Sequence, residues 1–260
     1  MMDRIAQFKA NPEFDKELMV RESRIPDFDL EDEKILGRMI ALIGYSNNAR
    51  ADKITPLVVN GVFERAFQNY SIKHVAGSSP KHIIRDHWTE LKAIRFKYKI
   101  ESMIECAKVL ASIQERYGSF MRYLREYGLP SRVESEVDIK VFWEAFNRIR
   151  AYLRQSGIPY FANFTSLCHL LLDQGFDCAK PDLAVMKTAV FLGIVPGPPK
   201  QKNNPEKLGN HPEASLRTTV ETIQSYAVHR STRAPVIDLY WLIRGGQTGV
   251  KTFMQAAYYA

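Results

Sequence analysis

Residues 157–193 carry the sequence GIPYFANFTSLCHLLLDQGFDCAKPDLAVMKTAVFLG. The stretch opens with a short turn, which an apolar segment with helical spacing follows. A connector then leads to Pro181-Asp182, and Asp is among the residues that most often begin a helix. One carboxylate therefore stands at the start of a helix about twenty residues after a tight turn. The stretch predicts two helices, the first preceded by the turn and the second by the carboxylate.

The composition predicts a soluble globular protein. The chain has 260 residues, of which 45% are hydrophobic and 25% charged. This length suffices for a sizeable core in one large or two small domains. The net charge of +7 favours a polyanionic partner, although a membrane surface and plain solubility are competing explanations of it. Residues 11–34 are acidic, so the remainder of the chain is more basic than the average.

Metal, disulfide and membrane features are not expected from this sequence. Cys106, Cys168 and Cys178 are too few and too scattered for a disulfide framework or a zinc site. The six histidines lack metal-ligand spacing, and we expect neither a metal nor a cofactor. No signal peptide and no long apolar run is visible. We therefore expect a monomeric cytoplasmic protein, nucleoid-associated in a bacterium, with no membrane contact.

Helical periodicity dominates the chain. In residues 97–116 an apolar stripe lies on one face and charges occupy the other, and Gly118 ends the helix. Residues 56–59 have local strand propensity, but no hairpin signal flanks them and we predict a helix there. Further helices are predicted over residues 31–44, 49–68, 80–87, 119–126, 137–155, 165–174, 182–193, 213–229, 234–243 and 248–258.

The predicted fold is all-α, a two-lobed helical bundle with negligible sheet. Residues 1–30 form an acidic extension, and residues 31–260 form the fold. Within it, residues of about 75–210 form the middle bundle, and residues 31–75 and 211–260 form the companion lobe. Residues 196–212, rich in Pro, Gly, Asn and Lys, are either a mobile surface loop or a basic arm that orders on DNA. The cleft between the lobes is the default site.

Residues 158–166 resemble the hairpin of a helix-hairpin-helix motif, written Leu-Pro-Gly-Val-Gly-x-x-Thr-Ala. Ile158, Pro159, Phe161 and Thr165 match it, and Tyr160 and Ala162 stand where it has glycines. Glycines there let backbone N–H groups approach a phosphate closely. The resemblance implies that the turn binds the DNA backbone through Tyr160, Phe161, Ala162, Asn163 and Thr165.

Three further segments resemble the HhH-GPD DNA glycosylase superfamily. Residues 181–193 are similar to its Asp-x-x-Val-x-Arg/Lys…Leu-Gly segment, and residues 40–54 to its early helix pair. Residues 96–124 resemble the Arg-x-x-Lys-Ile…Asn-Ala…Gly-Ser-Phe-x-x-Tyr-Leu segment of 3-methyladenine DNA glycosylase I. Together the resemblance covers residues of about 35–195. That branch also has a glutamate where this chain has Ile43, and a Cys/His zinc clip for which the termini here have no cysteine.

The resemblance implies a DNA glycosylase of base excision repair. Such an enzyme flips a damaged base, for example an alkylated one, out of double-stranded DNA and hydrolyses its N-glycosidic bond. Asp182 is the expected catalytic residue, because a carboxylate stabilises the positive charge that develops on the sugar. The alternative role of Asp182 is structural, as the N-cap of the helix over residues 182–193. Phe164 stands where bifunctional relatives have a lysine, which implies a monofunctional enzyme.

The other expected site residues bind the DNA strand or the extruded base. Lys180 and Lys187 are expected on phosphates, and the alternative for Lys187 is a solvated surface lysine. Asn47 and Asn48 either fill the gap in the duplex or form a plain turn. Asp238 is a second carboxylate of interest. Four aromatic residues either wall the base pocket or belong to the core; they are Tyr45, Trp88, Trp143 and Trp241.

The sequence leaves two other classes of function open. A non-catalytic helix-hairpin-helix protein would bind DNA structure without releasing a base. A helical protein-interaction scaffold would have no affinity for DNA.

Overall fold

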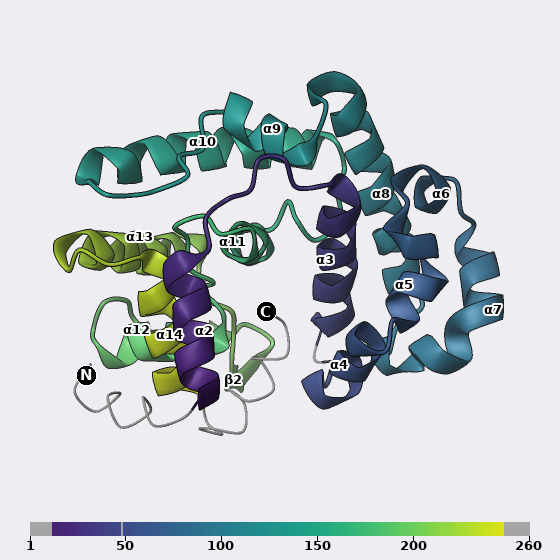
Figure 1. Cartoon of the computed structure of the whole chain (residues 1–260). Coiled ribbons are helices and arrows are strands. Elements are labelled where there is room, and N and C mark those ends of the chain that lie inside the picture. Colours follow the sequence, from purple (N-terminus) through teal and green to yellow (C-terminus); the bar gives the residue numbers. More distant parts are fainter. Residues whose placement is uncertain (1–11, 48, 247–260) are drawn as a thin grey trace. The chain divides into compact units, whose positions relative to one another are not determined.

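The computed structural model describes residues 12–47 and 49–246. Within this part of the chain the structure is helical apart from one small two-stranded sheet, which confirms the predicted all-α class (Figure 1). The α-helices are α2 (Pro12–Ser23), α3 (Asp32–Tyr45), α4 (Ala51–Val59), α5 (Val62–Ala66), α6 (Ile72–Ala76), α7 (Pro80–Leu91), α8 (Tyr98–Tyr117), α9 (Phe120–Glu126), α10 (Glu136–Gln155), α11 (Phe164–Asp173), α12 (Leu183–Phe191), α13 (Glu213–His229) and α14 (Ala234–Gly245). Two 3-10 turns, η2 (Gln68–Tyr70) and η3 (Lys92–Ile94), and the strands β1 (Lys200–Gln201) and β2 (Asn204–Leu208) complete the list.

The described chain divides into two compact units. Unit 1 consists of residues 12–26, 130–143 and 164–246. Unit 2 consists of residues 27–47, 49–129 and 144–163. This division differs from the predicted lobes, because residues 31–75 group with α8 rather than with α13 and α14. The reason is packing: α3 and α6 both lie against α8 in unit 2.

Unit 2 is organised around the apolar face of α8. Ile100, Met103 and Leu110 have no exposed surface, as the helical stripe predicts. Gly118 adopts a left-handed φ of 82° and its N–H bonds to Gln114, so the helix ends where the sequence indicates. The Asp32 carboxylate at the start of α3 accepts a 2.9 Å hydrogen bond from the backbone N–H of Phe120. This bond joins the first turns of α3 and α9.

Unit 1 has α14 at its centre. Every residue from Ala234 to Trp241 is buried, which agrees with the apolar sequence of this helix. Its last residue, Gly245, lies against the first turn of α12, where an added Cβ atom would come within 1.7 Å of the Ala184 carbonyl oxygen. Only glycine permits this approach. The Gly245-Gly246 pair therefore serves helix packing as well as helix termination.

The N-terminal helix α2 belongs to the core of unit 1. Phe14 is 1% exposed, and its ring centroid lies 5.8 Å from that of Tyr240 on α14. The acidic composition of residues 1–30 predicted an extension to the fold. Instead, the described part of this segment places a buried aromatic ring and Arg21 against α14.

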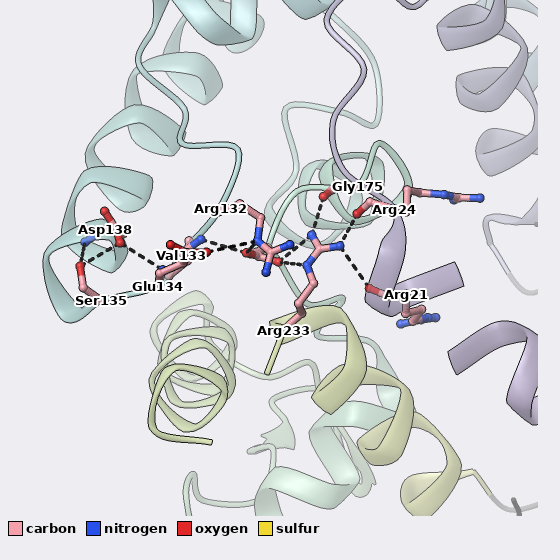
Figure 2. A network of polar contacts seen from close by, with 10 residues as sticks. Arg21, Arg24, Arg132, Val133, Glu134, Ser135, Asp138, Gly175 and Arg233 are labelled. Carbon is pink, nitrogen blue, oxygen red and sulfur yellow. Dashed lines mark hydrogen bonds and ion pairs between the residues drawn. The ribbon is translucent and has the colours of Figure 1, made fainter. Parts of the chain in front are cut away.

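A buried polar network joins α2, the connector before α10, and α14 (Figure 2). The Asp177 carboxylate accepts hydrogen bonds from Arg233 Nε at 2.7 Å and from the Val133 N–H at 2.9 Å, and Arg132 Nε lies 3.4 Å from it. Arg233 also donates to the backbone carbonyls of Arg21, Arg24 and Gly175. Burial lowers the pKa of the Arg233 guanidinium, and Asp177 opposes this shift. The network fixes segments of unit 1 that are far apart in the sequence.

The elements from residue 49 to residue 68 and from residue 200 to residue 208 agree with the sequence predictions only in part. Residues 56–59 are helical, as predicted. The predicted helix over 49–68 is divided into α4 and α5 by Gly61, which has a left-handed φ of 65°. Residues 200–208, within the predicted loop, form the antiparallel β1–β2 pair. The helix predicted over 248–258 lies outside the described residues.

Candidate functional site

Asp182 is the N-cap of α12. Its Oδ1 atom accepts hydrogen bonds from the backbone N–H groups of Ala184 at 2.9 Å and Val185 at 3.1 Å. These bonds satisfy amides that have no partner inside the helix, which stabilises a helix by about 1 kcal/mol. The structural alternative foreseen for Asp182 is therefore confirmed. The same bonds fix the orientation of the carboxylate.

The second carboxylate oxygen of Asp182 lies beside Lys180. Oδ2 is 3.4 Å from Lys180 Nζ, and 26% of the Asp182 side chain is exposed. Asp182 is therefore an oriented carboxylate that solvent can reach. The backbone N–H of Lys180 donates to Oδ1 of the buried Asp238 at 2.8 Å. This hydrogen bond fixes the backbone just before Asp182.

Asp238 has a structural role in unit 1. Its side chain is 2% exposed, and Oδ2 accepts a 2.6 Å hydrogen bond from Arg21. Burial raises the pKa of Asp238, and the Arg21 guanidinium opposes the rise. Of the two carboxylates predicted from the sequence, Asp182 is accessible to solvent. Asp238 is buried and holds the backbone of Lys180, two residues before Asp182.

The turn between α10 and α11, residues 156–163, is called the interhelical turn below. It begins where the N–H of Ile158 bonds to the Leu153 carbonyl oxygen at 3.2 Å and Gly157 adopts a left-handed φ of 73°. Tyr160 is also left-handed, with a φ of 61°. Arg150 Nε donates to the Ala162 carbonyl oxygen at 2.9 Å and holds the end of the turn. A tyrosine thus adopts the backbone conformation that glycine adopts most readily.

Asn47 joins the α3–α4 connection to this turn within unit 2. Its Nδ2 atom donates to the Tyr98 hydroxyl at 2.7 Å and to the Tyr160 hydroxyl at 3.1 Å. Asn47 and Tyr160 are 113 positions apart in the sequence, and both were predicted to contact DNA. The structure brings these two residues together. Asn48 lies outside the described residues.

Lys99 supports the same connection and was not singled out from the sequence. Its Nζ atom is buried and donates to the carbonyl oxygens of Gly44 at 3.0 Å and Ser46 at 2.8 Å. Burial lowers the pKa of Lys99 to about 8, and Arg95 adds to the shift. Lys99 therefore hydrogen-bonds the C-terminal end of α3, directly before Asn47. Its place in an otherwise apolar stripe was the available sequence signal.

Replacing Lys99 by Met is expected to lower the free energy of unfolding by about 1–3 kcal/mol, because two buried carbonyl groups lose their donor. Urea unfolding followed by circular dichroism measures this change. Lys97→Met is the matched control: Lys97 is exposed two residues away, and its contact with the Trp88 ring is worth about 1 kcal/mol or less, so the midpoint should change less than in Lys99→Met. Equal midpoints for the two variants would contradict the role given to Lys99.

The aromatic candidates for a base pocket differ in burial. Trp143 and Trp241 are 2% and 5% exposed in unit 1, and Trp143 Nε1 donates to Gln224 at 3.0 Å. Tyr45 and Trp88 are half-buried in unit 2. The Tyr45 hydroxyl lies 3.4 Å from Thr55 Oγ1, and burial raises its pKa to about 12. Tyr45 and Trp88 thus retain accessible surface, whereas the other two pack in the core.

The remaining positions of interest lie in the interhelical turn, in α11 and α12, and at Ile43 in α3. Phe164 is 5% exposed and stacks on Trp143 with ring centroids 5.7 Å apart, so this position offers no nucleophile. Asn163 is exposed, Thr165 and Lys187 are partly exposed, and Phe161 is buried. Ile43, which stands at the family's glutamate position, is fully buried in unit 2.

The predicted site residues are divided between the two units. Asp182, Lys180 and Lys187 belong to unit 1, together with Trp143 and Trp241. Unit 2 contains Asn47, Tyr45, Trp88 and the interhelical turn as far as Asn163.

Among the described residues, no helix is both long enough and apolar enough to cross a bilayer.

Comparison with known proteins identifies the class of this helical fold. A family model described as methyladenine glycosylase matches residues 31–168, which is more than half of the chain. The protein belongs to the methyladenine glycosylase family, and its role is that of a DNA glycosylase in repair. Curated proteins and solved structures give no significant match. The family match confirms the resemblance seen in the sequence, and it ends before Asp182.

Proposed function

We propose that the protein is a monofunctional DNA glycosylase that extrudes a damaged base from duplex DNA and hydrolyses its N-glycosidic bond with Asp182. The observation that carries the proposal is the geometry of this carboxylate. Two backbone amides hold Oδ1, and Oδ2 is not used by the cap. A carboxylate fixed in this way needs no reorganisation when positive charge develops on a sugar beside it.

The reaction needs only water and the carboxylate. The C1′–N bond breaks and its electron pair leaves with the base, so that a cationic alkylated purine departs as a neutral molecule. The sugar then carries oxocarbenium-like charge, which Asp182 stabilises. A water oxygen forms the new bond to C1′, and one water proton passes to the carboxylate and on to solvent. The products are the free base and an abasic site.

Lys180 makes the effective negative charge of Asp182 depend on DNA binding. Its ammonium group lies 3.4 Å from Oδ2, where its charge opposes the stabilisation of a cationic sugar. A DNA phosphate competes for the same ammonium group. Binding of the strand then draws Lys180 away and leaves the full negative charge of Asp182 for the sugar.

Unit 2 supplies the second set of DNA contacts. The interhelical turn grips phosphates through its backbone, and the α3–α4 connection with Asn47 faces the gap left by the extruded base. Thr165, in α11 of unit 1, follows the turn along the chain. The hydrogen bond between Asn47 and Tyr160 supports one surface built from both segments. Contacts to phosphates do not depend on the identity of the bases, so DNA binding is sequence-independent.

The base pocket is formed by aromatic side chains. Tyr45 and Trp88 are the favoured walls because both are half-buried. Trp143 and Trp241 belong to the buried core of unit 1. Aromatic faces attract cationic alkylated purines, which makes these bases the first substrates to test. The absence of an amine at Phe164 supports hydrolysis without strand cleavage.

The test is base release from a panel of duplexes carrying alkylated or deaminated bases. Release of at least one base, with an intact sugar–phosphate strand until alkali is added, supports the monofunctional enzyme. DNA binding without any release refutes it and favours the non-catalytic helix-hairpin-helix alternative. The tyrosine at the glycine position of the turn and the buried Ile43 are the observations that favour that alternative.

Replacing Lys187 by Ala is expected to weaken binding equally on damaged and intact duplexes. Removal of one phosphate contact lowers the slope of log affinity against log salt by about one unit. Fluorescence anisotropy across a salt series measures this slope. Lys187→Arg keeps the charge and should retain the slope. A loss confined to damaged DNA would place Lys187 at the base instead.

A further inference from the structure

Four consecutive exposed residues, Arg95, Phe96, Lys97 and Tyr98, are called the cation–aromatic strip below; the first three connect η3 to α8, and Tyr98 begins α8. Phe96 and Tyr98 are 37% and 49% exposed. Large aromatic side chains bury most of their surface in an ordinary core. These two neighbouring rings, each next to a cation in the sequence, instead leave more than a third of their surface to solvent.

The two rings form an ordered stack in unit 2. Their centroids are 5.4 Å apart and their planes differ by 23°. The Arg95 guanidinium lies 5.3 Å from the centroid of Phe96, and Lys97 Nζ lies 5.4 Å from that of Trp88. The strip thus combines flat apolar faces with two positive charges.

Hydrogen bonds hold the strip in place. The Tyr98 hydroxyl accepts from Asn47 Nδ2 at 2.7 Å, and Asn47 also donates to Tyr160 in the interhelical turn. The next residue along the chain, Lys99, is anchored by two backbone carbonyl groups. A ring that is already positioned loses little conformational freedom when a ligand stacks on it.

We propose that the cation–aromatic strip binds an unpaired nucleobase of a DNA strand by stacking, with Arg95 and Lys97 beside the flanking phosphates. The inference rests on the proposed function in taking DNA as the partner. Every base presents a π-face, and the alternation of cations and aromatic rings matches the alternation of phosphates and bases along a strand. The base is either the one left opposite an extruded nucleotide or one in single-stranded DNA.

Three DNAs that carry 2-aminopurine distinguish these sources: a single strand, a duplex with the probe opposite an abasic site, and a fully paired duplex. Fluorescence quenching reports stacking, and anisotropy reports affinity. Phe96→Leu and Tyr98→Leu are expected to weaken binding of the unpaired probe about tenfold, as loss of one stacking contact implies, and to remove the quenching. Binding of the fully paired duplex stays within twofold of the wild type.

Two control variants separate stacking from other effects. Tyr98→Phe removes the hydroxyl and keeps the ring, so binding stays within about threefold of the wild type. Phe191→Leu replaces a phenylalanine in unit 1 that is 67% exposed and has Arg244 3.9 Å from its ring centroid. This variant matches the chemistry of the strip and should bind all three DNAs as the wild type does.

The inference is overturned when the folded leucine variants bind the unpaired probe as tightly as the wild type. It is also overturned when they lose affinity equally for the paired duplex, because the strip then contacts the backbone alone. A wild type that binds none of the three DNAs refutes the proposed function itself. Quenching lost only with the single strand, or only with the abasic duplex, identifies the source of the base.

Discussion

Replacing Asp182 by Asn is expected to reduce base release by roughly 100- to 1,000-fold, the usual effect of removing one electrostatic group from a transition state. Asn is as good an N-cap as Asp, so the bonds to the Ala184 and Val185 amides are retained. The substitution therefore removes the charge and keeps the helix start. Single-turnover release of an alkylated base measures the rate.

The matched control is Asp138→Asn. Asp138 lies in the same unit in the first turn of α10, and its carboxylate also accepts a backbone hydrogen bond, from Glu134 at 3.0 Å. This variant should release base at the wild-type rate. DNA affinity of Asp182→Asn should equal or exceed that of the wild type, because a negative charge near the phosphates is lost. An active Asp182→Asn variant would leave Asp182 with its capping role alone.

Much of the fold could be predicted from local sequence patterns. The α8 stripe, the Gly118 stop and the apolar α14 each depend on residues within one helix, and the structure has these helices where they were predicted. The role of α2 could not be predicted in this way. Its acidic residues dominate the composition, whereas its function in the fold depends on Phe14 and Arg21, which contact α14 more than 200 positions later.

In the candidate site, too, local sequence patterns do not predict contacts between residues far apart in the chain. Asp182 could be chosen from Pro181-Asp182 because capping is a local property of a helix start. The contact between Asn47 and Tyr160 spans 113 positions, and no local pattern encodes it. Lys99 was also missed: its place in the apolar stripe of α8 is a local signal for burial, but that signal does not identify the partners of the ammonium group. Only the structure reveals that its ammonium group bonds the end of α3.

The largest effect on stability is expected from Asp177→Ala in unit 1. The Asp177 side chain is 2% exposed, and the Arg233 side chain is 4% exposed. Removing the carboxylate leaves a buried guanidinium without its counter-charge and the Val133 N–H without its acceptor. Breaking a buried pair in this way costs about 3–5 kcal/mol. The free energy of unfolding should fall by this amount in urea titrations followed by tryptophan fluorescence, to which Trp143 and Trp241 contribute from the same unit.

Two further variants test whether the buried pair is the cause. Glu221→Ala removes the exposed ion pair with Arg217 on α13 and should change the free energy of unfolding by roughly 0.5 kcal/mol or less. The double variant Asp177→Ala/Arg233→Ala should lose less than the sum of the two single variants, because no uncompensated charge remains. A loss for Asp177→Ala no larger than that for Glu221→Ala would contradict the network. Because the pair is buried, the predicted loss should also persist at high salt, whereas the small effect of Glu221 should be screened.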